Sequence, residues 1–123
     1  MISLALVISL ALPTYAALAV QTELEGEWQL VKSPIELNLF NGSDNGDMYC
    51  NAYAGSYITV KGAQCGGPLP ISFSPQASTQ VGCEANPEES RYLQSLETAQ
   101  EYEVCDDVLT ILGGSGELKF LRR

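Results

Sequence analysis

The sequence contains no histidine, which removes the commonest general base and the commonest nitrogen ligand for metals. Cationic side chains are also scarce, with six Lys and Arg against 15 Asp and Glu and a net charge of -9. Because no basic stripe is present, a nucleic-acid partner is not expected, and an anionic membrane surface would be repelled. We therefore expect a protein that is not an enzyme, with no catalytic residue, no metal and no cofactor.

The sequence also lacks an apolar run long enough to span a bilayer, which needs about 20 residues. The longest run, Met1–Leu12, stands at the N-terminus, and residues 1–19 carry no charge. Ala17-Leu18-Ala19 has the small-x-small pattern of a signal-peptide cleavage site. We interpret 1–19 as a secretory signal peptide, although no Lys or Arg precedes the apolar run; the alternative is a buried N-terminal strand or helix. The remaining 20–123 form one small domain without a transmembrane anchor.

Four cysteines lie in the expected mature domain: Cys50, Cys65, Cys83 and Cys105. An even number of thiols in a small exported chain is most simply interpreted as two disulfides. Neither a CxxC pair nor the spacing of a zinc knuckle is present, which argues against redox or metal chemistry. Four cysteines allow three connectivities, and the spacing alone does not choose among them. The predicted location is secreted or periplasmic.

Most of the domain is predicted to be short strands, because apolar and polar residues alternate between turn signals. The predicted strands are 27–32, 35–39, 48–50, 55–61, 69–73, 101–105, 108–112 and 117–121. The segment from Asn41 to Asp47 is dense in residues that tolerate positive φ, and it is predicted to be a hairpin loop.

One helix is predicted, from about Pro87 to Ala99. Asn86 is a good N-cap residue, and Glu88 and Glu89 suit the positive end of a helix dipole. The apolar stripe at helical spacing consists of Tyr92, Leu93, Leu96 and Ala99. With about eight strands and one helix (about 87–99), the fold class is α+β, mostly β: a small curled antiparallel sheet or partly open barrel.

Three motifs occur in a recognisable order: Leu24-x-Gly26-x-Trp28-x-Leu30, Cys50-Asn51-x-Tyr53-x-Gly55-x-Tyr57 and Ser78-Thr79-x-Val81-Gly82-Cys83. With the helix and closing strands that follow, this pattern resembles the META domain family of HslJ-like heat-shock and envelope proteins. The resemblance implies a compact β-rich fold with one helix in an exported protein. It also implies that Cys50 pairs with Cys83, which leaves Cys65 for Cys105. It supplies no catalytic residue, because the family defines none, and its members are linked to stress tolerance.

Four aromatic residues lie in or near the motif strands: Trp28, Tyr49, Tyr53 and Tyr57. Packing explains them; the functional alternative is an aromatic-lined groove for an apolar ligand or peptide. Our leading hypothesis is a monomeric, non-enzymatic domain that binds a protein or an apolar ligand in the envelope or outside the cell, with a role in stress. One alternative is a protease or lysozyme inhibitor that uses the loop 62–68. The other is a scaffold for envelope integrity without a small ligand.

Overall fold

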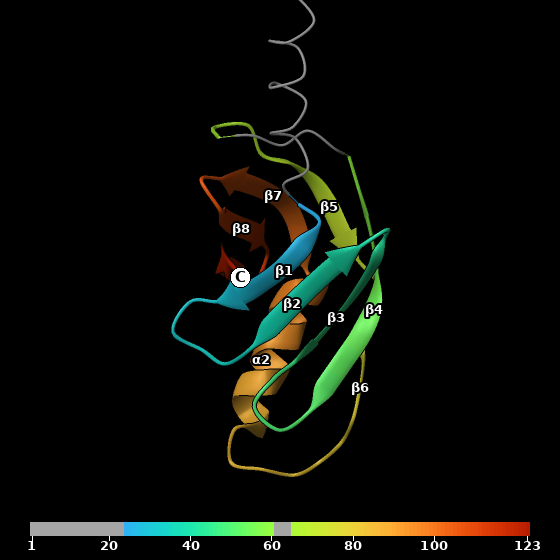
Figure 1. Cartoon of the computed structure of the whole chain (residues 1–123). Helices are drawn as coiled ribbons and strands as arrows, with labels where there is room; N and C mark the ends of the chain where they lie inside the picture. The colour runs from blue at the N-terminus through green and yellow to red at the C-terminus, as the bar shows by residue number, and fades with distance from the viewer. Residues whose placement is uncertain (1–23, 61–64) are drawn as a thin grey trace, which may run out of the picture.

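The computed structural model describes residues 24–60 and 65–123, which form nine strands and one helix (Figure 1). The strands are β1 (Gly26–Leu30), β2 (Glu36–Phe40), β3 (Ser43–Asp47), β4 (Ala52–Thr59), β5 (Leu69–Phe73), β6 (Ala77–Ser78), β7 (Ala99–Cys105), β8 (Val108–Gly113) and β9 (Gly116–Arg122). The helix, α2 (Asn86–Glu97), separates β6 from β7. The predicted signal peptide and residues 62–64 of the predicted inhibitory loop lie outside the described residues. Within the described ranges, no helix has the length and hydrophobicity that a membrane span requires.

The strands close into an antiparallel barrel. Their order is β3-β2-β1-β9-β8-β7-β5-β4, and β4 pairs with β3 to complete a ring of eight strands. The short β6 pairs with β4 as an additional strand. The predicted fold class, mostly β with one helix, is confirmed. The barrel is closed, so the strands of the ring are paired on both sides and expose few free backbone groups.

Side chains fill the interior of the barrel. On β2, the alternating residues Leu37 and Leu39 face inward and are completely buried, which is the pleated pattern that the sequence predicts. The largest fully buried apolar side chains are Trp28, Tyr102, Phe120, Leu37, Leu39, Leu96, Leu109 and Ile111. The residues of this set come from β1, β2, β7, β8, β9 and α2, so one core holds the sheet and the helix together.

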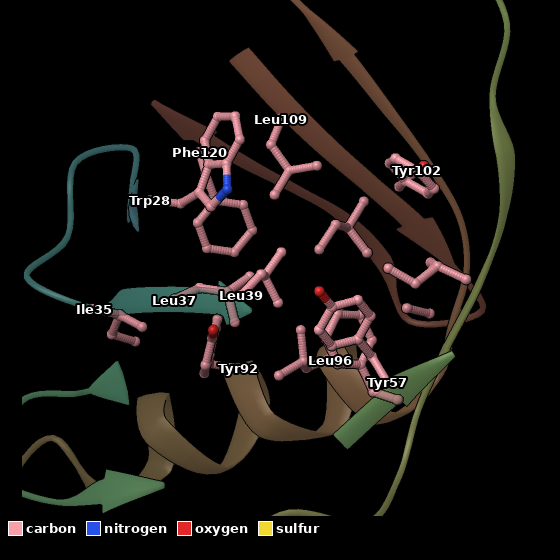
Figure 2. Close-up of a cluster of buried hydrophobic side chains, with 14 of the residues drawn as sticks. Trp28, Ile35, Leu37, Leu39, Tyr57, Tyr92, Leu96, Tyr102, Leu109 and Phe120 are labelled. Atoms are coloured by element: carbon pink, nitrogen blue, oxygen red, sulfur yellow. The ribbon is translucent and has the colours of Figure 1, made fainter. Parts of the chain in front are cut away.

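The helix packs on β5, β8 and β9 through the apolar stripe that the sequence predicts. Figure 2 shows Tyr92 and Leu96 of α2 pointing toward the side chains of the strands. The ring of Tyr92 meets the rings of Tyr53 and Phe120 edge-on, with centroids 5.5 and 6.4 Å apart. These aromatic contacts fix the position of α2 on the barrel.

The segment from Asn41 to Asp47 is mostly a strand, so the prediction of a hairpin loop over its whole length is wrong. Asn41 and Gly42 make the turn alone, with φ of 50° and 80°, and β3 follows directly. Backbone pairing with β2 on one side and β4 on the other holds this polar sequence extended. Glycine is needed at Gly46, because a Cβ atom there would lie 2.0 Å from the carbonyl oxygen of Glu36.

The predicted strand 48–50 is instead a bend that precedes β4. The N–H of Met48 donates to the carbonyl oxygen of Asn51 at 2.8 Å, and the N–H of Cys50 donates to the carboxylate of Glu89 at 2.7 Å. Because one of these N–H groups bonds within the bend and the other bonds to a side chain of α2, they do not extend a ladder with a neighbouring strand. The two-residue β6 has no alternation of its own, and the sequence did not predict it.

The helix was predicted over 87–99 and runs over Asn86–Glu97. Its N-cap residue is Ala85, without a side-chain cap, so the prediction of Asn86 as the N-cap is wrong. The side-chain oxygen of Asn86 instead accepts the N–H of Cys83 at 2.8 Å. The residue expected to cap the helix therefore ties its first turn to the preceding cysteine.

Candidate functional site

Two disulfides cross-link the barrel. One joins Cys50 to Cys83 and the other joins Cys65 to Cys105, with Cα atoms 6.7 and 4.7 Å apart. This connectivity is the one that the family resemblance implies, and no cysteine of the described residues is free. The sequence separations are 33 and 40, so each bridge contributes about 2–4 kcal/mol in the chain-entropy view. Such bridges persist in oxidising compartments, which fits an extracellular or envelope protein.

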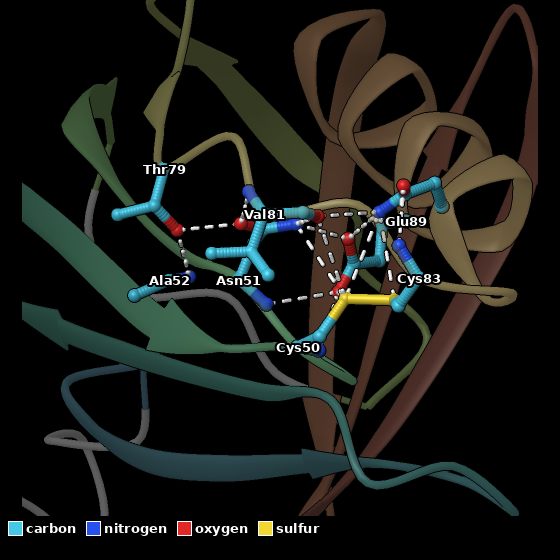
Figure 3. The surroundings of a disulfide bond; sticks show 8 residues. Cys50, Asn51, Ala52, Thr79, Val81, Cys83 and Glu89 are labelled. Atoms are coloured by element: carbon cyan, nitrogen blue, oxygen red, sulfur yellow. Dashed lines mark hydrogen bonds between the residues drawn. A yellow bond between two sulfur atoms is a disulfide. The ribbon is translucent and has the colours of Figure 1, made fainter.

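A buried carboxylate, Glu89, lies beside the Cys50–Cys83 disulfide (Figure 3). Its Oε2 atom accepts the backbone N–H groups of Cys50 and Asn51 at 2.7 and 3.1 Å. Its Oε1 atom accepts the side-chain amides of Asn51 and Asn86 at 2.8 and 3.1 Å. Burial by itself raises the pKa of Glu89, but these hydrogen bonds outweigh burial and hold the pKa below its ordinary value. We call Glu89 and its three partners the Glu89 network.

Asn51 extends the Glu89 network to the segment before α2. Its Oδ1 atom accepts the N–H of Val81 and the hydroxyl of Thr79, both at 2.7 Å (Figure 3). Its Nδ2 atom donates to the carbonyl oxygen of Val81 at 2.9 Å. One side chain thus supplies the hydrogen bonds that residues 79–81 would otherwise need from a strand. Because all four acceptor positions of Glu89 are occupied, the network is suited to holding structure, not to moving protons.

Two groups of side chains in the described residues bring sulfur and carboxylate atoms close together. They are Cys50, Cys83 and Glu89, and Cys65, Cys105 and Asp106. In both groups the sulfur atoms are bonded to each other, so neither group offers a thiolate ligand. In the oxidised protein these residues do not fit a metal ion.

A pocket of about 320 Å³ opens beside α2, and we call it the helix pocket. Its apolar lining consists of the buried or half-buried side chains Leu30, Ile35, Tyr92 and Leu118. Its polar lining consists of Lys32, Ser33, Tyr49, Glu88, Arg91 and Ser95. The hydroxyl of Tyr49 donates to Oε2 of Glu88 at 3.3 Å. The pocket thus combines apolar side chains that a ligand could cover with polar groups that could fix its orientation.

A second hollow of about 230 Å³ also borders α2, next to the bend 48–50 and residues 78–81; we call it the polar hollow. Its lining includes Asn51, Asn86 and Glu89, whose polar atoms already bond within the Glu89 network. The helix pocket exposes more apolar surface than the polar hollow does. We therefore regard the helix pocket as the candidate site.

Four aromatic residues were considered as the lining of a groove, and three of them belong to the core. Trp28, Tyr53 and Tyr57 are 0%, 3% and 7% exposed. The hydroxyl of Tyr53 donates to the carbonyl oxygen of Glu36 at 2.7 Å, so even its polar end is used internally. Tyr49, at 40% exposure, lines the helix pocket. The structure therefore does not bring the four rings together in one open groove.

Sequence reasoning missed most of the helix pocket, including Lys32, Arg91 and Leu118. Lys32 has a φ of 59° in the turn after β1, Arg91 lies on α2, and Leu118 lies on β9. These segments are far apart along the chain, so no local spacing joins them. Of these three residues, only Arg91 could have been found from the sequence. It lies on the predicted helix, directly before Tyr92 of the buried apolar stripe.

A second buried carboxyl group, Asp44 on β3, was also missed. Burial raises its pKa from 3.8 to about 6, although a hydrogen bond from the Gln76 amide lowers it. The Oδ2 atom of Asp44 and the Oε1 atom of Gln76 are buried without a hydrogen-bond partner in the described residues. Because Asp44 is 1% exposed, it is closed to a substrate, and we assign it no catalytic role.

Comparisons with known proteins agree with this architecture. The profile of the META domain matches residues 16–123. A solution NMR structure of a protein from Burkholderia xenovorans superposes with a TM-score of 0.62 at 22% identity, covering 88% of this chain and 87% of the other. At that identity the likeness concerns the fold alone. No curated protein gives a significant match to the chain.

Proposed function

The chain belongs to the META domain family, and from this premise we propose that it is an exported, non-enzymatic binding domain that recognises its ligand at the helix pocket. The ligand that we propose is apolar, either a small molecule or an apolar part of a protein met in the envelope or outside the cell. We include a role in stress, because the resemblance links family members to stress tolerance. The observation that carries the proposal is a filled barrel beside an open pocket.

The filled interior directs recognition to the surface. The side chains of Trp28, Phe120 and Leu109 occupy the barrel and are completely buried, which leaves binding to surface features such as the helix pocket. In the helix pocket, the half-buried Leu30 and Leu118 offer apolar surface that remains partly open to solvent. Covering such surface is the main source of affinity for an apolar ligand.

The two buried carboxyl groups support a non-enzymatic role. Glu89 is saturated by four N–H groups, and Asp44 is enclosed in the barrel. A general base must reach the proton that it removes, and neither group is placed to do so. With histidine absent from the sequence, a catalytic role has little support.

Export is the first part of the proposal to test. Protein recovered from its host should lack residues 1–19, and none of its thiols should react with an alkylating reagent until a reductant is added. Intact mass before and after reduction measures both properties. A cytosolic chain with an intact N-terminus and four alkylated cysteines would contradict export.

Recognition at the helix pocket is tested with two matched variants on α2. Ser95→Phe fills the helix pocket, whereas Ser90→Phe makes the same change at the polar hollow. We expect apolar ligands found by NMR titration to lose binding in the first variant and to keep it in the second. Equal loss in both variants, or loss in Ser90→Phe alone, would place recognition elsewhere.

A second candidate function is inhibition of a protease or lysozyme by the loop 62–68, of which the structure describes 65–68. Residues 65–68 are exposed, and the Cys65–Cys105 disulfide anchors them. The N–H of Gly66 also donates to the carboxylate of Glu103 on β7. An exposed segment anchored by a disulfide suits inhibition. Lack of inhibition across a panel of proteases and lysozymes would remove this candidate.

A further inference from the structure

The helix pocket brings together two cations that have no ion-pair partner. In the described chain, neither Lys32 nor Arg91 lies within 4.0 Å of a carboxylate oxygen, although both line the pocket. By contrast, Arg122 pairs with Asp107 at 3.0 Å and Arg123 pairs with Glu36 at 2.8 Å. Among the described residues Lys119 on β9 also has no ion pair, but it lies outside the pocket lining, whereas Lys32 and Arg91 line the same pocket.

The helix pocket also holds one acidic residue, Glu88, whose charge offsets one of the two cations. Glu88 accepts a hydrogen bond from the hydroxyl of Tyr49. Two cations and one carboxylate leave the rim positive, next to a floor that includes Leu118 and Tyr92. The complementary ligand therefore carries a negative group joined to an apolar group.

The strands at the helix pocket argue for a free small acid over a peptide. Peptides that bind as extended chains usually add to an open strand edge. Here β1 pairs with both β2 and β9, and β9 pairs with both β1 and β8. The volume of about 320 Å³ lies at the lower end of the range for ligand sites, which suits a small molecule.

We propose that the helix pocket binds a small carboxylic acid with one apolar group, whose carboxylate faces Lys32 and Arg91 and whose apolar group covers Leu118 and Tyr92. This inference rests on the proposed function and names the ligand class for the same pocket. A carboxylate accepts hydrogen bonds from both cations, and burial of the apolar group shields these bonds from water.

The test compares 3-phenylpropionate with its neutral isostere 3-phenylpropanamide by NMR titration of the oxidised protein. We expect saturable shifts for Ser33, Ser95 and Leu118 with the acid, and about tenfold weaker binding of the amide, a factor that corresponds to about 1.4 kcal/mol. Equal affinities for the two probes would overturn the carboxylate inference while leaving apolar recognition at the pocket intact. If neither probe binds, both the inference and the proposed function lose their support.

Charge-reversal variants test whether Lys32 and Arg91 bind the carboxylate of the ligand. Lys32→Glu and Arg91→Glu should each weaken binding of 3-phenylpropionate about tenfold or more. Lys119→Glu makes the same change on β9 at a residue outside the pocket lining, and it should stay within about twofold of the wild type. An equal effect of all three variants would show a response to net charge alone and would overturn the assignment. Tighter binding of a short peptide ending in phenylalanine would overturn the choice of a free acid.

Discussion

Glu89 is the residue on which the structure around the start of α2 depends. Its two oxygens accept four N–H groups, two at each atom, from the bend 48–50, Asn51 and Asn86. A carboxylate is suited to this position because it offers only acceptors. An amide at this position would direct its NH₂ group toward two donors in either orientation.

We therefore expect Glu89→Gln to lower the free energy of unfolding by about 2–4 kcal/mol. Urea unfolding of the oxidised protein measures the change. The control is Glu88→Gln on the same turn of α2, where the side chain is exposed and the change should stay within about 0.5 kcal/mol. Similar losses in the two variants would mean that negative charge at the helix start, not the hydrogen bonds, stabilises this corner.

Asp44 makes stability depend on pH. Its pKa of about 6 in the folded protein exceeds the ordinary value of 3.8, so the folded state binds this proton more tightly than the unfolded state. The contribution of protonated Asp44 to the free energy of unfolding is fully present below about pH 4 and is lost as the pH rises through 6. Asp44→Asn should remove this loss. The free energy of unfolding of the variant should exceed that of the wild type by about 1–3 kcal/mol between about pH 4.5 and 7.

The control for Asp44 is Asp47→Asn, which removes an exposed carboxyl from the same strand and should not give the gain expected for Asp44→Asn. Urea unfolding at several pH values measures both variants. A wild-type profile that does not fall between about pH 4 and 6 relative to Asp44→Asn would show that Asp44 ionises without penalty. Glu89 acts with the opposite sign: its pKa is lowered, so its contribution is lost as the pH falls through its folded pKa.

At the scale of the elements, the alternation of apolar and polar residues predicts the strands that bury one face. It does not predict a strand that is extended only because its neighbours pair with it. β2, β5 and β8 follow the predicted alternation, because their apolar residues face the core. β3 has the polar sequence Ser43–Asp47 and is extended only because β2 and β4 pair with it. Its turn-forming residues were identified, but the length of the turn depends on neighbours that are remote in sequence.

Gly46 tests this account of β3. We expect Gly46→Ala to lower the free energy of unfolding by about 2–4 kcal/mol, because the added Cβ would collide with the backbone of Glu36. Gly114→Ala is the matched control, since a Cβ there meets no atom within 4 Å, and its effect should stay within about 0.5 kcal/mol. Thermal or urea unfolding measures both. A neutral Gly46→Ala would show that β2 and β3 separate easily.

The candidate site was less predictable than the elements. The helix 87–99 and the cysteines were identified from the sequence, because local periodicity and residue type suffice for them. The helix pocket joins Lys32, Tyr49, Arg91 and Leu118, which share a surface only after the barrel has closed. The aromatic residues of the motif strands were a poor guide to the site. Most of them are core residues, because large rings near strands pack in the core more often than they contact a ligand.

At the scale of the whole molecule, the two disulfides stabilise a closed barrel in different ways. The Cys65–Cys105 bridge anchors the exposed loop 65–68 to β7, whereas the Cys50–Cys83 bridge adjoins the Glu89 network. Replacing the first pair by alanine should cost about 2–4 kcal/mol of unfolding free energy through chain entropy. Replacing the second pair should cost more, because the network loosens as well.

Urea unfolding of the two double-alanine variants, each with the other bridge intact, measures this difference. The reference is the oxidised wild type under the same conditions. A larger loss on removal of the Cys65–Cys105 bridge would contradict the view that the disulfide and the Glu89 network act together.

The central claim is that this barrel recognises an apolar ligand on its surface beside α2. The most direct test is a crystal structure of the oxidised protein with the tightest ligand from an NMR panel. The account predicts the ligand in contact with Tyr92 and Leu118, with the barrel interior still filled by side chains. A ligand inside the barrel, or seated in the polar hollow against Asn51, would contradict it.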